Sequence, residues 1–561
     1  MLYPNAIVLG ALLTTETLGF AFVGAPPYLG LRSSSSAGPL GLGRRPTSSE
    51  RQPRFWKSEL GTKNGNTERA SSVSDSGTDG DDGGVGAVPA RAPAVVVGGD
   101  NRPERICVLG GGFGGLYAAL RLQKMPWRGR RPTVTLVDKR DKFTFLPLLY
   151  EFAIGNAELD EVAPTFRELL AGSGVSFVQG CVSDVDLGGK EVKVVGAVSD
   201  DLEGFMVSDG NDQERTLKYD KLVVAVGAEP ASLMDKVPGA REHAIPFYSI
   251  EDSYRIKQAI IKLKANLKKD TTVARVVVVG GSYAGVELSC NLATELGGRG
   301  RKGVGKVEVT LATSSEILST AAPSNQQAGV RRLSESGVRV MKGTKVSEVK
   351  DGGVVVLQRA EEGRGRHSTT LTKKKQEEEI EADLLVWTAG SQPSSLIQAL
   401  DVRKDSTGRV EVDRRLRLAG AAAAGKGGGG AGDVYCLGDI AAVEGLDLAC
   451  NAQVALQQSD YVAYNIWAEK ERRKPLDFRF LNLGEMMNLG GLDGSVTTLG
   501  GRVKLTGKAA GLARRAVYAV RMPTNPQRLR AAASAAAGTA FSVTETIVNR
   551  GLDILERSSK E

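Results

Sequence analysis

Short, mainly apolar stretches, each followed by glycine, recur through the middle of the chain. Residues 106–109 and 275–279 have the length that a buried parallel strand needs, and a glycine-rich turn and a helix pattern follow each of them. Two further runs, 222–228 and 384–390, lead into glycine turns in the same way. Strand, turn and helix therefore occur twice in the same order, which predicts an α/β fold with two similar parallel sheets.

The first turn has the glycine spacing of a dinucleotide site. Gly110, Gly112 and Gly115 give Gly-x-Gly-x-x-Gly, which allows a tight turn, close approach to a pyrophosphate and close packing of helix on strand. Backbone N–H groups at the start of the helix bind the pyrophosphate. The next strand, 134–137, leads into Asp138, whose carboxylate can accept hydrogen bonds from an adenosine ribose. This order predicts a Rossmann-like domain.

The second turn repeats the first with two differences. Gly280 and Gly285 keep their places, but Ser282 replaces the middle glycine, and the partner strand 307–311 leads into Thr313 where the first copy has an acid. A carboxylate at this place favours NADH, because it repels the 2′-phosphate of NADPH. Since that carboxylate is missing, we expect NADPH to be used at least as well as NADH.

The bulk composition narrows the chemistry. The 561 residues carry a net charge of +8, which suits an anionic membrane surface or nucleic acid and selects neither. Five cysteines without a Cys-x-x-Cys pair argue against a disulfide framework, a dithiol redox centre and a zinc site. The two histidines, His243 and His367, leave little material for a histidine-based metal site or catalytic triad. We therefore expect no metal.

The N-terminal part differs in character from the middle of the chain. Residues 1–22 hold an apolar core that is too short to span a membrane, as in a signal peptide. Residues 23–103 are rich first in Ser and Arg and then in Gly, Ser and Asp, as in a transit peptide followed by a disordered linker. Together they resemble the bipartite leaders of algal plastids; an ordinary secretory leader with a disordered tail is the alternative. Further on, the low-complexity segments 361–379 and 419–432 predict solvated loops.

Two other segments bear on the site. Residues 509–522 have the pattern of a basic amphipathic helix, in which Arg514 and Arg515 alternate with apolar residues. Such a helix can lie on an anionic membrane surface, and the alternative is a helix that packs on the core with its cations in water. Residues 143–151 predict an extended segment, because Pro147 disfavours helix.

Four stretches together resemble the type II NAD(P)H:quinone oxidoreductases, and most closely their plastid and cyanobacterial branch. The stretches are Phe145–Glu151, Gly280–Glu287, Asn451–Gln458 and Asn482–Gly490. These enzymes are two-dinucleotide-binding-domain flavoproteins. The resemblance implies a domain for FAD and an inserted domain for NADPH or NADH. It also implies two-electron transfer from NAD(P)H through FAD to a membrane quinone, either plastoquinone or a phylloquinone precursor, without proton pumping.

The resemblance also implies roles for single residues. Glu287 would lie near the flavin and relay a proton toward the quinone, or else interact only with the helix dipole. Gln453 and Gln457 share a helix face that would meet the quinone head group, or else are surface polar residues. Asp439 would bind the ribityl chain of FAD. The other expected cofactor-binding residues lie in turns and at strand ends: Gly110, Gly112, Phe113, Gly114, Gly115, Asp138, Lys139, Gly227, Gly438, Gly280, Ser282, Tyr283, Gly285, Thr313 and Gly390.

The expected domain order follows from the inserted second unit. After the leader and linker, residues 104–245 and 396–475 would form the FAD domain, 246–395 the NAD(P)H domain, and 476–561 a C-terminal membrane-associating region. The implied location is the periphery of a thylakoid or plastoglobule membrane in the plastid, with the mitochondrion as the alternative. The identity of the quinone and a homodimeric state stay open, and no nucleic-acid partner is expected.

Two rival hypotheses remain. The first is another flavoprotein of the superfamily, such as a sulfide:quinone or ferredoxin reductase; sulfide chemistry would require two of Cys181, Cys290 and Cys450 to meet in space. The second is a redox-sensing flavoprotein similar to the apoptosis-inducing-factor-like proteins, in which the bound nucleotide switches a partner interface. Fast electron transfer from NAD(P)H to quinone would separate the enzyme from the sensor.

Overall fold

The computed structural model describes residues 102–196, 214–230, 234–267, 273–297, 306–360, 375–419, 431–534 and 536. These residues all belong to one compact unit. The predicted signal-like segment, residues 23–101 of the predicted transit peptide and linker, and most of the two low-complexity loops lie outside them.

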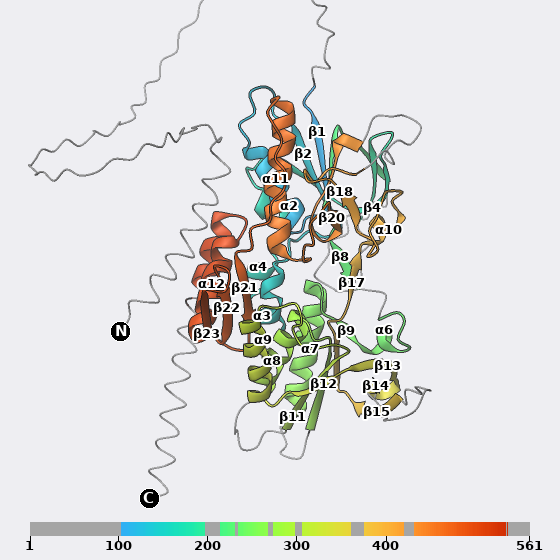
Figure 1. Ribbon diagram of the computed structural model, residues 1–561, viewed down its shortest axis with the longest axis vertical. Coiled ribbons are helices and arrows are strands. Elements are labelled where there is room, and N and C mark those ends of the chain that lie inside the picture. Colours follow the sequence, from blue (N-terminus) through green and yellow to red (C-terminus); the bar gives the residue numbers. More distant parts are fainter. Residues whose placement is uncertain are drawn as a thin grey trace, which may run out of the picture. The chain divides into compact units, whose positions relative to one another are not determined.

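A five-stranded parallel sheet forms around the first glycine turn. Its strand order is β19 (Val434–Cys436), β7 (Lys221–Val224), β1 (Arg105–Leu109), β2 (Thr133–Asp138) and β3 (Val175–Gln179). The central strand β1 is apolar on both faces because the sheet is covered on both sides. Helix α2 (Phe113–Lys124) packs on the sheet, and α11 (Ala452–Lys470) packs along α2 (Figure 1).

A second five-stranded parallel sheet repeats this arrangement around the second turn. Its order is β12 (Arg339–Lys342), β11 (Lys306–Thr313), β10 (Val273–Val279), β16 (Leu384–Trp387) and β9 (Ile245–Pro246). Helices α7 (Ile250–Asn266), α8 (Tyr283–Leu296) and α9 (Pro323–Glu335) belong to the same half of the molecule (Figure 1). The predicted fold, with two Rossmann-like α/β units, is confirmed.

Each parallel sheet is accompanied by a three-stranded antiparallel sheet. The first consists of β4 (Cys181–Asp186), β5 (Glu191–Val195) and β6 (Arg215–Lys218), and the second of β13 (Thr344–Lys350), β14 (Val354–Ala360) and β15 (Lys375–Glu381). The prediction of a loop was wrong for residues 375–379, which belong to β15. These residues are polar, and they form a strand because β14 pairs with them along its whole length.

Short elements connect the two halves. Strand β8 (Ala228–Pro230) follows the end of β7 and pairs with β17 (Ser391–Pro393), which follows the end of β16 (Figure 1). Strands β18 (Val410–Val412) and β20 (Ala441–Val443) pair in parallel. The remaining short helices here are α6 (Ala240–His243), α10 (Ser395–Ala399), η2 (Asp351–Gly353), η4 (Ala431–Asp433) and η5 (Gly438–Ile440).

The segment around Pro147 is helical rather than extended. It forms η1 (Leu146–Leu148) and α3 (Leu149–Ala153), and α4 (Leu159–Val162) and α5 (Phe166–Leu170) follow. The prediction was wrong because Pro147 lies in the first turn of η1, where a missing N–H costs no hydrogen bond. This turn places Glu151 on α3.

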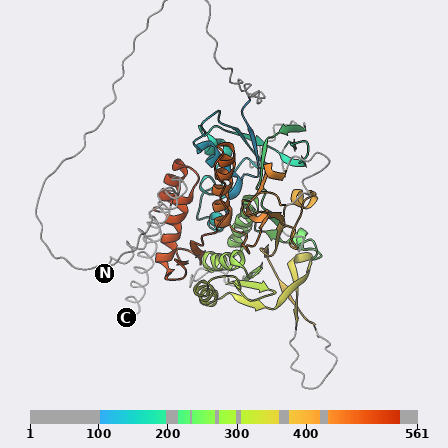
Figure 2. The same cartoon turned by 45° about the horizontal axis from the view of Figure 1, so that its top comes forward.

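The C-terminal region folds onto the rest of the unit. Strands β21 (Gly484–Asn488), β22 (Gly494–Thr498) and β23 (Val503–Gly507) form an antiparallel sheet, and α12 (Lys508–Arg521) follows. Helices α9 and α12 both pack on β22, which is buried along its length, and Figure 2 shows α12 on the outer side of the described residues. The expected helix is therefore present. Within the described ranges no helix has the length and apolar character needed to cross a membrane.

Candidate active site

The first glycine turn has one open position between two crowded ones. Gly110 has φ +95°, and a side chain there would overlap the carbonyl oxygen of Ala225. A side chain on Gly115 would overlap the carbonyl oxygen of Gly110, so the helix lies directly against the turn. A Cβ on Gly112 would meet no atom within 4 Å. The turn therefore leaves free space at Gly112, where a pyrophosphate would approach the backbone.

The second glycine turn has the same geometry. Gly280 has φ +122°, and a side chain on Gly285 would overlap the carbonyl oxygen of Gly280. Ser282 precedes the first residue of α8 with φ −79° and ψ −174°, close to the φ −73° and ψ −165° of Gly112 before α2. The exposed Ser282 side chain thus replaces glycine without changing the backbone path.

The residues beside the first turn are engaged mainly through their backbone. Phe113 packs in an aromatic cluster, with ring centroids 5.2 Å from Phe143 and 5.4 Å from Phe145, so its contribution to a cofactor site would come from its N–H. Gly114 lies against the Leu437 side chain. Lys139 is exposed directly after the strand end.

Asp138 links the end of β2 to the glycine turn. Its Oδ2 accepts a hydrogen bond from the N–H of Gly111 at 2.6 Å, and its Oδ1 accepts one from Arg140 at 2.8 Å. Burial raises the pKa of Asp138, and these two hydrogen bonds oppose the rise. The carboxylate therefore lies at the edge of the turn, where an adenosine ribose binds in this fold.

The two strand-end glycines and the segment after β19 lie at the same edges of the sheets. Gly227 has φ +68°, with free space where a Cβ would be, and Gly390 has φ +77°. Gly438 has φ +77° and donates its N–H to Oε1 of Gln458 at 2.6 Å. Burial raises the pKa of the neighbouring Asp439, and Arg409 opposes the rise. Positive φ favours glycine at all three turns.

Gln458 was not among the predicted site residues. It is fully buried on α11, and its Nε2 has no hydrogen-bond partner in the part of the chain that the structure describes. A buried amide N–H that lacks a partner indicates a missing ligand or water. The spacing of Gln453 and Gln457 marks another face of α11, and no sequence signal distinguishes Gln458 from an ordinary polar residue.

Glu287 is buried in the first turns of α8. Its Oε1 accepts the backbone N–H of Asn488 at 2.6 Å. Burial raises the pKa of Glu287 to about 7, although hydrogen bonds from Asn488 and Tyr150 and the charge of Arg514 oppose the rise. Near neutral pH this carboxyl group is therefore poised between its protonated and ionised forms, as a proton donor requires.

Gln453 and Gln457 lie on one face of α11, as predicted. Gln453 donates to the carbonyl oxygen of Gly484 at 3.1 Å and accepts from the N–H of Leu483 at 3.0 Å. Gln457 makes the same pair of bonds with Leu481, at 2.8 and 2.9 Å. Both carboxamides therefore fix the segment that leads into β21. Contact with a quinone would use the remaining N–H of each.

A buried ionic cluster connects Glu287 to α12. Glu151 pairs with Arg514 and, at 2.8 Å, with Arg515. The Nδ2 of Asn488 lies 3.4 Å from Oε1 of Glu151, so Asn488 contacts both carboxylates. The side chain of Arg514 is only 2% exposed. The helix therefore packs on the core, as the alternative expected, but Arg514 and Arg515 are directed toward Glu151 and not toward water.

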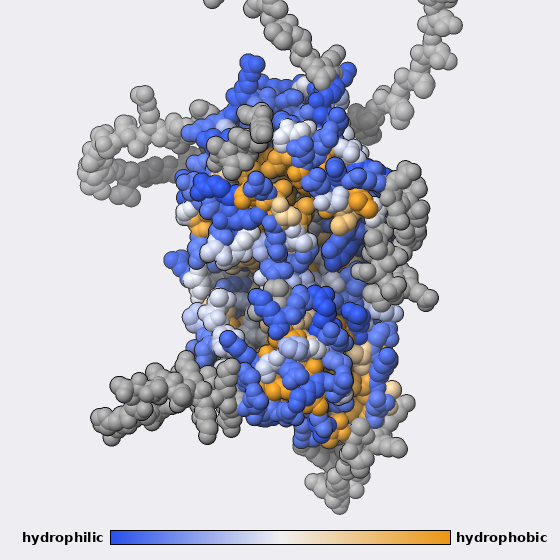
Figure 3. Space-filling model, turned by 90° about the vertical axis from the view of Figure 1, so that its right-hand side faces the viewer, coloured by the Kyte–Doolittle hydropathy of each residue, from blue (hydrophilic) through white to orange (hydrophobic). Residues whose placement is uncertain are grey.

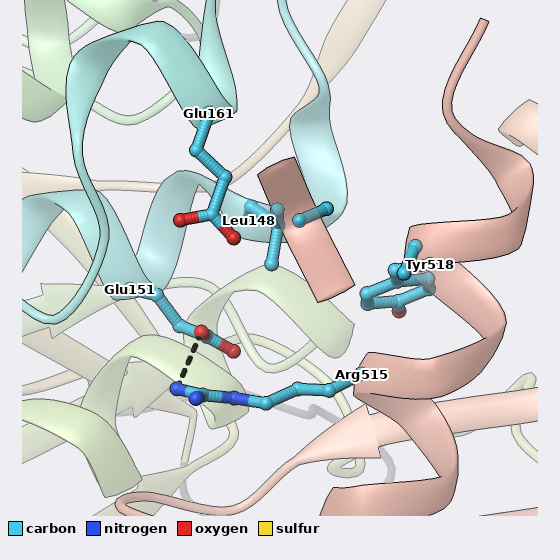
Figure 4. A pocket seen from close by; sticks show the side chains of 7 residues that line it. Leu148, Glu151, Glu161, Arg515 and Tyr518 are labelled. Atoms are coloured by element: carbon cyan, nitrogen blue, oxygen red, sulfur yellow. Dashed lines mark hydrogen bonds and ion pairs between the residues drawn. The ribbon is translucent and has the colours of Figure 1, made fainter. Parts of the chain in front are cut away.

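The cluster borders a small cavity. Figure 4 shows Arg515 and Glu151 pointing toward each other, with Glu161 and Tyr518 nearby. The cavity has a volume of about 10 Å³, the space for the centre of one water molecule, and Leu148, Ala519 and Ala531 complete its lining. Burial, with the nearby charge of Glu151, raises the pKa of Glu161, while the hydroxyl of Ser534 donates to its carboxylate. The residue types alone did not indicate this cluster, whose members are far apart in the sequence.

The five cysteines are divided between buried and exposed positions. Cys107 and Cys436 are buried in the first sheet, as predicted. Cys290 is buried in α8, whereas Cys181 and Cys450 are exposed, and all five cysteines are free.

The described residues fit FAD in the first sheet. Free space at Gly112 and Gly227 would accommodate the pyrophosphate and the adjoining parts of the cofactor, and the N-terminus of α2 would face the phosphates. The unpaired Nε2 of Gln458 supplies a hydrogen-bond donor beside the turn at Asp439. The second sheet, with exposed Ser282 and the neutral Thr313, fits a second dinucleotide. Tyr283 beside it donates to Oε2 of Glu485 at 2.5 Å and so connects this turn to the C-terminal sheet.

Comparison with known proteins places the chain among flavin-dependent oxidoreductases. The model of the pyridine nucleotide-disulphide oxidoreductase family matches residues 104–458. Demethylphylloquinone reductase NdbB of Synechocystis sp. is 37% identical over 431 residues, which cover 76% of this chain and 93% of that protein. The alternative NAD(P)H-ubiquinone oxidoreductase C1, chloroplastic/mitochondrial, of Arabidopsis thaliana is 34% identical over 456 residues, 77% of this chain and 80% of that protein.

Solved structures share the fold. NDH2 from Plasmodium falciparum in complex with NADH has a TM-score of 0.61 at 17% identity, covering 77% of this chain and 97% of that chain. The sulfide:quinone oxidoreductase from Aquifex aeolicus has a TM-score of 0.57 at 17% identity, covering 75% and 92%. At these identities the structures support the architecture alone. The family model and the two relatives show that this chain belongs to the pyridine nucleotide-disulphide oxidoreductase family, in its branch of type II NAD(P)H:quinone oxidoreductases.

Proposed function

We propose that this protein is an FAD-dependent enzyme that transfers two electrons from NAD(P)H to a membrane quinone. The observation that carries the proposal is the pair of equivalent glycine turns, one beside Asp138 and one beside Thr313, in a chain that aligns with 93% of a demethylphylloquinone reductase. In this proposal residues 104–245 and 396–475 hold FAD, and residues 246–395 hold NAD(P)H. The quinone is a phylloquinone precursor or plastoquinone.

The chain's own residues orient the reactants and supply a proton. FAD held in the first sheet would supply the redox chemistry, taking a hydride from NAD(P)H and giving two electrons to the quinone. Reduction of the quinone to quinol also needs two protons: one comes from NAD(P)H as part of the hydride, and the other must come from solvent. Glu287 is suited to donate that second proton, because burial keeps a substantial fraction of its carboxyl protonated near neutral pH.

The C-terminal sheet orients Glu287. Asn488 donates its backbone N–H to this carboxyl group, and Asn488 ends the strand that Gln453 and Gln457 fix at its beginning. The two glutamines thus act on the proton donor through β21, and their free N–H groups would face the quinone. Glu151 lies at the other end of the buried ionic cluster that includes Glu287, and its ion pairs with two arginines hold it in place.

Membrane contact is a further part of the proposal, with a revised set of residues. Among the exposed cations of the C-terminal region, Arg502, Lys504 and Lys508 lie close in the sequence to exposed Leu499 and Leu512. Cations and leucines of this kind bind anionic lipid surfaces. The face opposite α12 is largely hydrophilic, with apolar residues in separate areas (Figure 3). We propose a plastid membrane as the location and a homodimer as the assembly, which a sizing experiment tests.

One purified preparation tests the proposed function. The holoenzyme should be yellow with bound flavin, NADH or NADPH should bleach it, and a short-chain quinone should restore the colour with steady turnover at the rates typical of enzymes, about 1 per second or faster. A protein whose flavin is reduced but is not reoxidised by quinone would instead favour the redox sensor. Turnover with sulfide and no reaction with NAD(P)H would favour the sulfide:quinone rival.

A further inference from the structure

Equivalent positions at the edges of the two parallel sheets carry opposite charge. In the first sheet β2 ends at Asp138, which lies beside Gln179 of β3. In the second sheet β11 ends at Thr313, which lies beside Lys342 of β12. The first sheet thus has an acidic residue beside a neutral one at this edge, whereas the second sheet has a neutral residue beside a basic one. Since the adenosine ribose binds at this edge, this charge meets the 2′ position of the nucleotide.

The end of β11 adjoins the glycine turn that would hold the nucleotide. A Cβ on Gly281 would lie 2.5 Å from Oγ1 of Thr313, so the two segments are in contact. Oγ1 of Thr313 also accepts a hydrogen bond from the N–H of Ser315 at 3.3 Å, which closes a small turn and leaves Ser314 and Ser315 exposed. A ribose beside this turn therefore faces two hydroxyls and the strand that carries Lys342.

Lys342 is held by an ion pair that a stronger anion can displace. Its Nζ lies 2.7 Å from Oε2 of Glu316, and the two side chains are 47% and 66% exposed. Ion pairs between side chains this exposed contribute little to stability, so breaking one costs little. A dianionic phosphate would attract the ammonium group more strongly than one carboxylate does.

The next arginines along the chain are engaged elsewhere. Arg332 donates from Nε to the carbonyl oxygen of Leu489 at 2.9 Å and lies 3.3 Å from Asp493. Arg331 lies 3.7 Å from Glu335 on its own helix. Both arginines therefore serve α9 and the C-terminal sheet, and Lys342 is the cation that the register places beside the end of β11.

We propose that Lys342 recognises the 2′-phosphate of NADPH and that Glu316 accepts a hydrogen bond from the 2′-hydroxyl of NADH. When NADPH binds, Lys342 leaves Glu316 for the phosphate; when NADH binds, the ion pair persists and Glu316 faces the ribose. The exposed ion pair between Lys342 and Glu316 thus allows the site to bind both nucleotides. The inference rests on the proposed function, because it requires a nicotinamide nucleotide at the second turn.

Binding of two nucleotide fragments to the full-length holoenzyme tests the inference. The probes are 2′,5′-ADP and 5′-AMP, measured by titration calorimetry. Lys342→Ala should weaken 2′,5′-ADP by about tenfold or more, the value of one charge-assisted hydrogen bond, and should change 5′-AMP by less than about twofold. Lys342→Arg should restore most of the affinity. Flavin reduction by NADPH and NADH should follow the same order.

Lys350→Ala is the matched control. Lys350 makes an equally exposed ion pair with Glu379, at 2.5 Å with side chains 44% and 56% exposed, on the antiparallel sheet rather than at the end of β11. It should leave the ratio of the two affinities unchanged. An unchanged ratio in Lys342→Ala, or an equal loss in Lys350→Ala, would overturn the assignment while leaving the proposed function intact. A wild-type protein that binds neither fragment and whose flavin neither nucleotide reduces would overturn both.

Discussion

Replacing Glu287 with glutamine should shift the stability difference in favour of the variant as pH rises, while slowing the reaction with quinone. Burial raises the pKa of Glu287 from 4.5 to about 7. At about 1.4 kcal/mol for each pH unit, this difference corresponds to about 3 kcal/mol. Glutamine keeps an oxygen that can accept the N–H of Asn488, so the change removes mainly the charge.

The sign follows from proton binding. Between about pH 4.5 and 7 the folded protein keeps a proton on Glu287 that the unfolded chain has released. The contribution of this group to stability is therefore present at low pH and is lost as pH rises through about 7. The free-energy difference between Glu287→Gln and the wild type should thus shift in favour of the variant by up to about 3 kcal/mol from about pH 5 to pH 8.

Chemical denaturation of the two holoenzymes at several pH values measures this difference. Buried acids that lie away from Glu287 contribute equally to both proteins and cancel. Glu295→Gln is a suitable control, because Glu295 lies on the same helix but forms a surface ion pair with Lys264; its difference from the wild type should stay flat over this range. A flat difference for Glu287→Gln as well would refute the assignment of a buried, partly protonated carboxyl group.

The same variant tests the proton donor. Glu287→Gln should lower the quinone-dependent turnover by about a hundredfold or more, the usual contribution of general acid catalysis. Flavin reduction by NAD(P)H, measured by stopped flow without quinone, should be unaffected. In the wild type, quinone turnover should fall as pH rises through about 7, because the donor loses its proton. Full turnover in the variant, with an unchanged pH profile, would exclude this role.

Three further predictions concern the two nucleotide sites and the membrane. Gly112→Val should fold but bind no flavin, because the new side chain meets no protein atom and occupies the space of the pyrophosphate. Gly115→Ala should unfold, because its side chain would overlap the carbonyl oxygen of Gly110. Circular dichroism and the visible spectrum separate the two outcomes, and a yellow, active Gly112→Val protein would contradict the FAD site. Thr313→Glu should lower kcat/KM for NADPH by about tenfold and largely spare NADH; an equal change for both nucleotides in steady-state assays would show that the selectivity lies elsewhere. Lys504→Glu with Lys508→Glu should weaken binding to anionic vesicles by about tenfold or more, and unchanged binding would exclude this contact surface.

The repeated architecture could be predicted because its signals are local. A buried strand, the glycines after it and the following helix are contiguous in sequence, and each glycine is required by the backbone at its own position, as Gly110 and Gly115 are. The neutral residue at Thr313 could be compared with Asp138 for the same reason. Local patterns were less informative where pairing decides the structure, since the polar residues of β15 become a strand through β14.

Apart from the glycine turns, the tertiary structure determines which residues form the site. The pattern of residues 509–522 describes a basic helix equally well on a membrane, in water or against the core. Its arginines are buried because Glu151, more than 350 positions earlier, meets them there. Lys342 likewise lies beside Thr313 only because neighbouring parallel strands are joined by a long crossover, which brings distant residues into register. The role of a charged side chain depends on its partner. When the partner comes from a separate element, the packing of the two elements decides which residues meet.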